Sequence, residues 1–149
     1  MRKPIFNTLK AFGACALLAA SCLSAQTGHT IIVNVPFDFV VMNKHMVAGT
    51  YDVTTDILTT TVVIRGEDNG SAALALTRSA QAGKAQEQAK LVFKRYGDRY
   101  FLAEVWHAGT DQGRVLGTSK IEQELARNTG KREIIALLAS GLRQHKPIR

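Results

Sequence analysis

Apolar and polar residues alternate along most of the chain, which is the pattern of half-buried strands rather than of helices. Runs rich in β-branched, aromatic or aliphatic residues at 30–35, 50–54, 61–65 and 72–77 are separated by turn residues. The strongest turn signal is Gly66-Glu67-Asp68-Asn69-Gly70, because an Asn-Gly pair tolerates the positive φ angles of tight turns. The sequence therefore predicts a series of short strands joined by short connections.

A β-hairpin is predicted where the runs 90–96 and 99–106 flank Gly97-Asp98. Glycine at the first central position of a two-residue loop favours a type II′ turn. Such a loop pairs Tyr96 with Arg99 and fixes the register of the whole hairpin.

In that register Phe93 pairs with Leu102, and Leu91 lies opposite Glu104. The predicted core face consists of Leu91, Phe93, Tyr100, Leu102 and Trp106. The opposite face mixes apolar and charged residues, so another segment, such as the C-terminal one, is expected to cover part of it.

Helix is predicted only near the C-terminus. Ser119-Lys120-Ile121-Glu122 has the form of a capping box and should start a helix that runs from Lys120 to about Arg127. Residues 131–144 could form a second helix, with one side made of Ile134, Ile135, Leu138 and Leu142. The expected fold is mainly β, a small antiparallel β-sandwich or barrel with one or two C-terminal helices. Its parts are a β-rich domain over 26–130 and a basic C-terminal helix or tail over 131–149.

The first 25 residues have the order of a secretory signal peptide. A basic start with Arg2, Lys3 and Lys10 is followed by an apolar run over 11–23 and by Leu23-Ser24-Ala25, a small-residue cleavage site. The protein is therefore expected to be exported, to the periplasm or the cell exterior. The apolar run is shorter than the roughly 20 residues of a membrane-spanning helix.

Both cysteines of the chain, Cys15 and Cys22, lie in this signal, so cleavage leaves a mature chain without disulfides or thiol chemistry. A second interpretation concerns Ala19-Ala20-Ser21-Cys22, which loosely matches a lipoprotein signal whose cysteine is acylated. Cleavage after Ala25 and lipidation at Cys22 both remain open, and the second would anchor the protein to a membrane surface.

The net charge of +7 is confined to the two ends of the chain. Residues 26–130 carry eleven Lys or Arg and eleven Asp or Glu, whereas residues 131–149 carry five basic residues and one acidic residue. A nucleic-acid-binding domain would spread positive charge over its folded surface, so nucleic acid is excluded as a partner. The basic tail is instead a candidate for contact with an anionic membrane surface.

No set of residues with catalytic or metal-binding spacing is found. The histidines lack the i, i+4 spacing of zinc ligands, and no serine lies in a Gly-x-Ser-x-Gly elbow. His107 and Asp111 form one candidate pair, and Glu104 is the one acid on the predicted core face. The sequence thus predicts no enzyme, no catalytic residue, no metal and no cofactor.

Candidate ligand-binding residues are Phe93, Leu102, Trp106, His107 and Glu104. Aromatic residues in strands more often form a core than a pocket, although a small barrel can hold one apolar ligand. The leading interpretation is an exported, non-enzymatic β domain of the cell envelope that acts as a binding or structural module. The alternatives are a carrier of a small apolar ligand in a barrel cavity, and an envelope hydrolase.

Several segments resemble a group of small, uncharacterised exported bacterial β-rich proteins. The resemblance rests on Val35-Pro36-Phe37-Asp38-Phe39-Val40-Val41, Ala48-Gly49-Thr50-Tyr51-Asp52-Val53, Leu91-Val92-Phe93 with Arg95-Tyr96-Gly97-Asp98-Arg99-Tyr100-Phe101-Leu102 and Trp106, and Ser119-Lys120 before Glu124-Leu125-Ala126. It implies export and a strand-rich domain over most of 31–127, and it supplies no catalytic residue.

Overall fold

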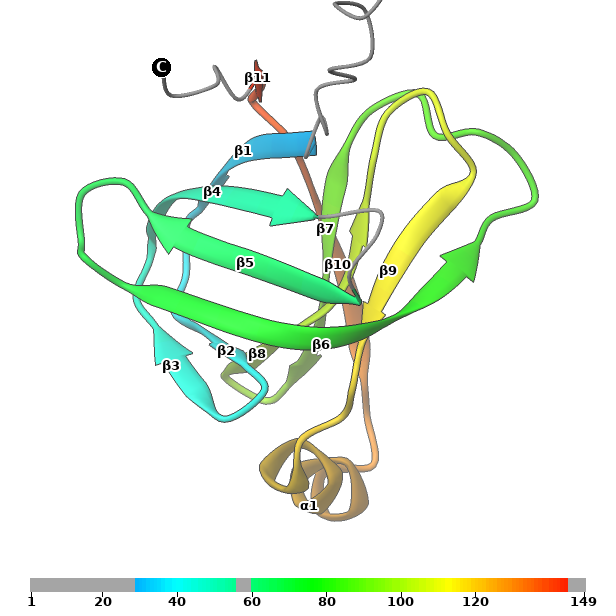
Figure 1. The fold of residues 1–149 in the computed structure, drawn as a ribbon. Coiled ribbons are helices and arrows are strands. Elements are labelled where there is room, and N and C mark those ends of the chain that lie inside the picture. The colour runs from blue at the N-terminus through cyan, green and yellow to red at the C-terminus, as the bar shows by residue number, and fades with distance from the viewer. Residues whose placement is uncertain (1–28, 56–59, 145–149) are drawn as a thin grey trace, which may run out of the picture.

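The computed structural model describes residues 29–55 and 60–144, and nearly all of its regular structure is strand (Figure 1). The strands are β1 (His29–Val35), β2 (Phe39–Val41), β3 (Lys44–Met46), β4 (Gly49–Thr55), β5 (Thr61–Gly66), β6 (Ala72–Gln81), β7 (Lys90–Tyr96), β8 (Arg99–Trp106), β9 (Gln112–Leu116), β10 (Glu133–Leu138) and β11 (Gly141–Gln144). One helix, α1 (Lys120–Thr129), follows β9. The prediction of a mainly β fold with helix near the C-terminus is confirmed at this level.

The eleven strands form one mixed sheet, whose main path runs β10-β7-β8-β9-β6-β5-β4-β1-β11. Strand β2 branches from this path, because it pairs in parallel with β8 and antiparallel with β3. The two ends of the path belong to neighbouring parts of the chain: β10 pairs with β7, and β11, which begins at Gly141, pairs with β1. Between them, the Ala139 amide donates to the Ala89 carbonyl and the Ser140 amide donates to the Ile32 carbonyl.

The strands curl around a shared apolar interior (Figure 1). Alternate residues of each strand point inward, and the buried cluster comprises Ile31, Val33, Val35, Phe39, Val41, Met46, Tyr51, Val53, Val62, Ile64, Ala73, Ala75, Ala89, Leu91, Phe93, Leu102, Val105 and Leu116. The buried Tyr51 hydroxyl donates to the Val47 carbonyl and accepts from the Asn69 side-chain amide at 3.0 Å. The one large polar tip in this cluster is therefore hydrogen-bonded.

The β7–β8 hairpin has the predicted turn. Tyr96 pairs with Arg99 and Phe93 pairs with Leu102. Gly97 has a φ of +59°, and Asp98 is not among the residues with positive φ. A positive φ at the first central residue alone is the signature of a type II′ turn.

Farther from the turn, the predicted register is wrong by one residue. Ala103 is an extra residue in β8, so Glu104 lies opposite Val92 rather than Leu91, and Val105 lies opposite Leu91. Such a β-bulge exchanges the faces of all residues beyond it. Val105 therefore points into the core, while Trp106, predicted on the core face, lies on the other face of the sheet.

The second helix predicted over 131–144 is wrong, because this segment forms β10 and β11. Ile135 and Leu137 pack against the core, whereas Ile134 and Leu138 point outward and are 56% and 58% exposed. A short apolar run fits either a helix or a strand. The unpaired edges of β7 and β1 decide the outcome, since strand pairing satisfies their backbone groups.

The helix α1 starts and stops where predicted. The Ser119 hydroxyl accepts a hydrogen bond from the Glu122 amide at 3.2 Å, and Gly130 ends the helix with a φ of +62°. The chain must cross β8 and β7 to pass from β9 to β10, since those strands lie between them in the sheet. The Glu122 carboxylate lies 3.4 Å from Lys94 Nζ, so α1 packs on the outer face of β7. This connection, rather than the C-terminal segment, lies over the mixed face of the hairpin.

Candidate functional site

Two of the predicted ligand-binding residues belong to the core. Phe93 is 0% exposed and Leu102 is 3% exposed. The rings of Phe37 and Phe39 meet Phe93 edge-on, with centroid distances of 5.3 Å and 5.4 Å. Side chains without accessible surface cannot line a space that admits even a water molecule. The structure therefore assigns Phe93 and Leu102 to packing.

Trp106 and Glu104 are joined by a hydrogen bond on the outer face of the sheet. The Trp106 indole N–H donates to the Glu104 carboxylate at 2.7 Å. The indole ring also lies over Gly113, where an added Cβ would be 2.4 Å from a ring carbon. Gly113 is thus required for the close approach of the tryptophan, and the Trp106 ring is 8% exposed.

His107 and Asp111 have partners on different strands. His107 Nε2 and the Thr55 hydroxyl share a hydrogen bond. Asp111 accepts a hydrogen bond of 2.7 Å from the Gln81 side-chain amide. The Asp111 contact joins the neighbouring strands β6 and β9, whereas the His107 contact joins the end of β8 to β4, which is not its neighbour in the sheet. Neither His107 nor Asp111 lines the surface cleft at the β2–β3 hairpin.

A surface cleft of about 330 Å³ lies between the β2–β3 hairpin, the β7–β8 turn and the start of α1. Its lining, from here on called the hairpin cleft, consists of Asp38, Phe39, Val40, Asn43, His45, Asp98, Arg99, Tyr100 and Ile121. This volume is at the lower end of the range for small-molecule sites. The cleft joins three segments that are distant in the sequence.

One wall of the hairpin cleft is held by Asp38. Its carboxylate accepts a hydrogen bond from the Ala48 amide at 2.8 Å and lies 3.7 Å from His45 Nε2. Both side chains remain exposed, at 59% and 64%. Met42, at the turn between β2 and β3, has a φ of +56°, a conformation that a non-glycine residue rarely adopts. The turn and the Asp38 contact together fix the position of His45.

The opposite wall is built on Tyr100, whose ring stacks on Phe37 at a centroid distance of 3.9 Å. The Arg95 guanidinium lies 5.4 Å from the centroid of the same ring, a cation–π contact. Next to this wall, Ile121 on α1 is 42% exposed. Among the described residues, none forms an ion pair with the guanidinium of Arg99. The hairpin cleft therefore offers a free cation beside exposed apolar surface.

The lining of the hairpin cleft combines hydrogen-bonding, charged and apolar side chains. His45 and Asp38 resemble a general base and its orienting acid, but the lining contains no Ser, Thr or Cys to act as a nucleophile. Within residues 29–55 and 60–144, no group of three His, Cys, Asp or Glu residues is placed to hold a metal ion.

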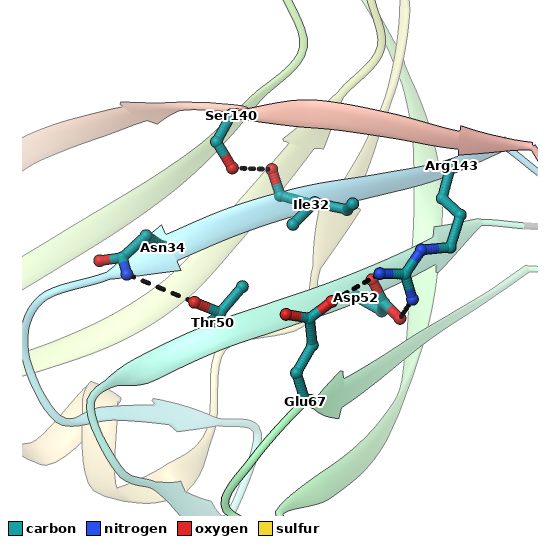
Figure 2. A network of polar contacts seen from close by, with 7 residues as sticks. All are labelled: Ile32, Asn34, Thr50, Asp52, Glu67, Ser140 and Arg143. Atoms are coloured by element: carbon teal, nitrogen blue, oxygen red, sulfur yellow. Dashed lines mark hydrogen bonds and ion pairs between the residues drawn. The ribbon is translucent and has the colours of Figure 1, made fainter.

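A second polar cluster lies on the outer face of β1, β4 and β11 (Figure 2). Arg143 donates to Asp52 at 2.8 Å and to Glu67 at 2.7 Å, so one guanidinium joins two carboxylates. The Ser140 hydroxyl donates to the Ile32 carbonyl at 3.1 Å, and the Asn34 amide donates to the Thr50 hydroxyl at 3.4 Å. The contacts of Ser140 and Arg143 hold the last strand to the sheet, and the contact of Asn34 joins β1 to β4. The Arg143 guanidinium and the two carboxylates pair with one another.

The basic tail predicted over 131–149 is thus largely part of the fold. Arg143 is held by two carboxylates, and Lys131 lies 3.7 Å from Glu133. Lys146 and Arg149 lie outside the described residues, as do Cys22 and the predicted cleavage site after Ala25.

A scan against protein-family models finds no match, and searches of curated proteins and of solved structures find no significant match. The resemblance to small exported bacterial proteins therefore stays a prediction. Across the part of the chain that the structure describes, no helix combines the length and the apolar character needed to cross a bilayer.

Proposed function

We propose that the protein is an exported, non-enzymatic binding domain of the cell envelope, with the hairpin cleft as its ligand site. The observation that carries the proposal is the pairing of an unpartnered cation, Arg99, with the exposed side chain of Ile121 in one cleft of about 330 Å³. An anionic group of the ligand would contact Arg99, and an apolar group would cover Ile121. Asn43 and His45 add further hydrogen-bonding groups at the rim.

The scaffold for this site is, in our proposal, a closed barrel rather than a sandwich. The support is the last chain segment, since β10 pairs with β7, β11 pairs with β1, and only residues 139 and 140 separate the two strands. In such a barrel the segment after α1 would join the two ends of the strand path. The contacts of Arg143 with Asp52 and Glu67 would hold this closure from outside.

The two alternative functions have less support. A carrier of an apolar ligand needs an interior cavity, whereas inward side chains such as Phe93, Val33 and Val53 are all 0% exposed. An envelope hydrolase with a hydroxyl or thiol nucleophile needs that group beside its base, and the lining of the hairpin cleft contains no Ser, Thr or Cys. Binding in the cleft is the function that the described geometry favours.

The cleft proposal is tested with N-acetyl-leucine, a probe that joins a carboxylate to a small apolar side chain. We expect amide chemical-shift changes in the isotope-labelled protein at Asn43, Arg99, Tyr100 and Ile121. Arg99→Gln should weaken binding about tenfold, equivalent to a charged hydrogen bond of roughly 1.5 kcal/mol. The uncharged N-acetyl-leucinamide should bind the wild-type protein as weakly as the acid binds Arg99→Gln. It should bind the wild type and Arg99→Gln with the same affinity.

Arg127→Gln is the matched control, because Arg127 lies on the exposed surface of α1 and does not line the hairpin cleft. It should bind the probe as the wild type does. Equal binding of the acid and the amide, or shift changes scattered away from the cleft, would contradict the proposed role of Arg99.

Export makes a separate prediction about the mature N-terminus. Mass spectrometry of the protein purified from its own cells should show a chain that starts at Gln26 or at an acylated Cys22. Cys22→Ser distinguishes these results, because it leaves cleavage after Ala25 unchanged and prevents acylation. An uncleaved chain recovered from the cytoplasm would disprove export.

A further inference from the structure

A second surface, remote in sequence from the hairpin cleft, lies on the outer face of β5 and β6. Its centre consists of Val63, Leu74 and Leu76, and it is flanked by Arg65 and Arg78; we call these five residues the β5–β6 face. Leu74 and Leu76 are 64% and 65% exposed, and Leu74 lies directly opposite Val63 in the sheet. An exposed group of aliphatic side chains on one sheet face marks a contact surface more often than a single exposed leucine does.

In strand β6 the small side chains point inward and the large apolar side chains point outward, the reverse of the usual arrangement. Its inward positions hold the small side chains of Ala73 and Ala75, which are 9% and 1% exposed, while the two leucines point outward. A shift of one residue in pairing would bury the leucines, but the register Val62–Ala75 and Val63–Leu74 prevents it. Burial in this domain therefore does not explain why leucine occupies positions 74 and 76.

The rim of the face is positively charged. Arg65 lies opposite Ala72, and Arg78 is two residues beyond Leu76 on the same side of β6. Asp52 is the register partner of Arg65, but its carboxylate contacts Arg143 at 2.8 Å. No carboxylate within residues 29–55 and 60–144 forms an ion pair with Arg65 or Arg78. The β5–β6 face thus combines an apolar centre with two unpaired cations.

We propose that the β5–β6 face rests on an anionic lipid surface. The leucines would enter the boundary between headgroups and acyl chains, and the two arginines would contact lipid phosphates. A second copy of the chain is a poorer occupant, because the five residues of the face include two arginines and no acid, so two stacked faces would repel each other. A protein partner is also less favoured, since the centre lacks the Trp and Tyr side chains that supply most of the binding energy in protein interfaces.

The test compares variants purified in their mature, exported form by co-sedimentation with vesicles made of equal parts phosphatidylglycerol and phosphatidylcholine. The N-terminus is the same in every variant, so differences in binding report the folded surface. Leu74→Ser/Leu76→Ser should reduce the fraction bound about tenfold. Arg65→Gln/Arg78→Gln should reduce it severalfold on these vesicles and leave it unchanged on pure phosphatidylcholine, because the arginines act through lipid charge. The loss of binding caused by Arg65→Gln/Arg78→Gln should become smaller as the salt concentration rises.

The matched control is Ile134→Ser/Leu138→Ser, which removes two apolar side chains of similar exposure, 56% and 58%, from β10. It should bind vesicles as the wild type does, and thermal unfolding checks that each variant folds. Wild-type binding by the leucine variant, or an equal loss in the control, would overturn the proposal. So would a concentration-dependent dimer that the leucine variant loses, because the face would then serve a second copy of the chain.

Discussion

Phe93→Ala is expected to lower the free energy of unfolding by about 3–5 kcal/mol. Phe93 is 0% exposed and lies at the centre of an aromatic group, with Phe37 and Phe39 edge-on against its ring. Removal of the ring deletes a large buried apolar surface and leaves a cavity that the surrounding strands can fill only in part. A loss of this size is a large fraction of the 5–15 kcal/mol that stabilises a typical domain.

The measurement is urea-induced unfolding, followed by the fluorescence of Trp106. Phe93→Leu keeps most of the volume and should cost under about 1.5 kcal/mol, so it remains measurable if the alanine variant does not fold. Leu74→Ala is the exposed control and should change stability by no more than about 0.5 kcal/mol. A cost below about 1 kcal/mol for Phe93→Ala would show that the interior is not close-packed. That result would favour the apolar-ligand carrier over the cleft as the functional site.

The local parts of the fold could be predicted from the sequence. The turn at Gly97-Asp98 and the pairing of Phe93 with Leu102 depend on residues within a few positions of the turn. The bulge at Ala103 was not predicted, although Glu104, an acid on the predicted core face, was the one polar residue that pointed to a change of register. As a result Trp106 was expected in the core, but it lies on the outer face beside Glu104.

The C-terminal segment shows the limit of periodicity. Ile134, Ile135 and Leu138 fit one face of a helix. In the structure the segment is a strand, and its alternate residues Ile135 and Leu137 pack against the core. The choice depends on the edges of β7 and β1, which are about 40 and 110 residues away along the chain, counted from the pairs Ile135–Phe93 and Leu142–Ile31. A window of ten or fifteen residues contains no information about those edges.

The hairpin cleft was missed for the same reason. Its lining comes from residues 38–45, 98–100 and 121, so no local sequence motif indicates it. One signal was available: Ile121 is an apolar residue in the first turn of a mostly polar helix, where solvent would favour a polar side chain. Read together with the unpaired Arg99, such an exposed residue marks the site more clearly than the aromatic residues of the hairpin do.

The capping box at the start of α1 was predicted correctly for its serine but not for its glutamate. Ser119 caps α1 as predicted, whereas the carboxylate of Glu122 faces Lys94 on β7. Glu122 is the one buried residue of α1 and is 4% exposed. The cation that faces it is Lys94, whose Nζ lies 3.4 Å away and whose side chain is 21% exposed.

Lys94→Met is accordingly expected to destabilise the domain by about 3 kcal/mol, near the lower end of the cost of breaking a buried ion pair. The substitution keeps the aliphatic stem but leaves the Glu122 carboxylate buried without a cation, and Glu122 Oε1 has no hydrogen-bond partner among the described residues. The double variant Lys94→Met/Glu122→Met should return to within about 1 kcal/mol of the wild type, because two apolar side chains of similar size avoid both desolvation costs.

Urea unfolding of the wild type, both single variants and the double variant gives the coupling energy between the two sites. Lys120→Met is the matched control for loss of a lysine, since Lys120 is exposed at the start of the same helix. If Lys94→Met costs no more than this control, or if the double variant costs the sum of the singles, the ion pair does not hold α1 on β7. Contacts of α1 with the hairpin other than this ion pair would then hold the helix in place.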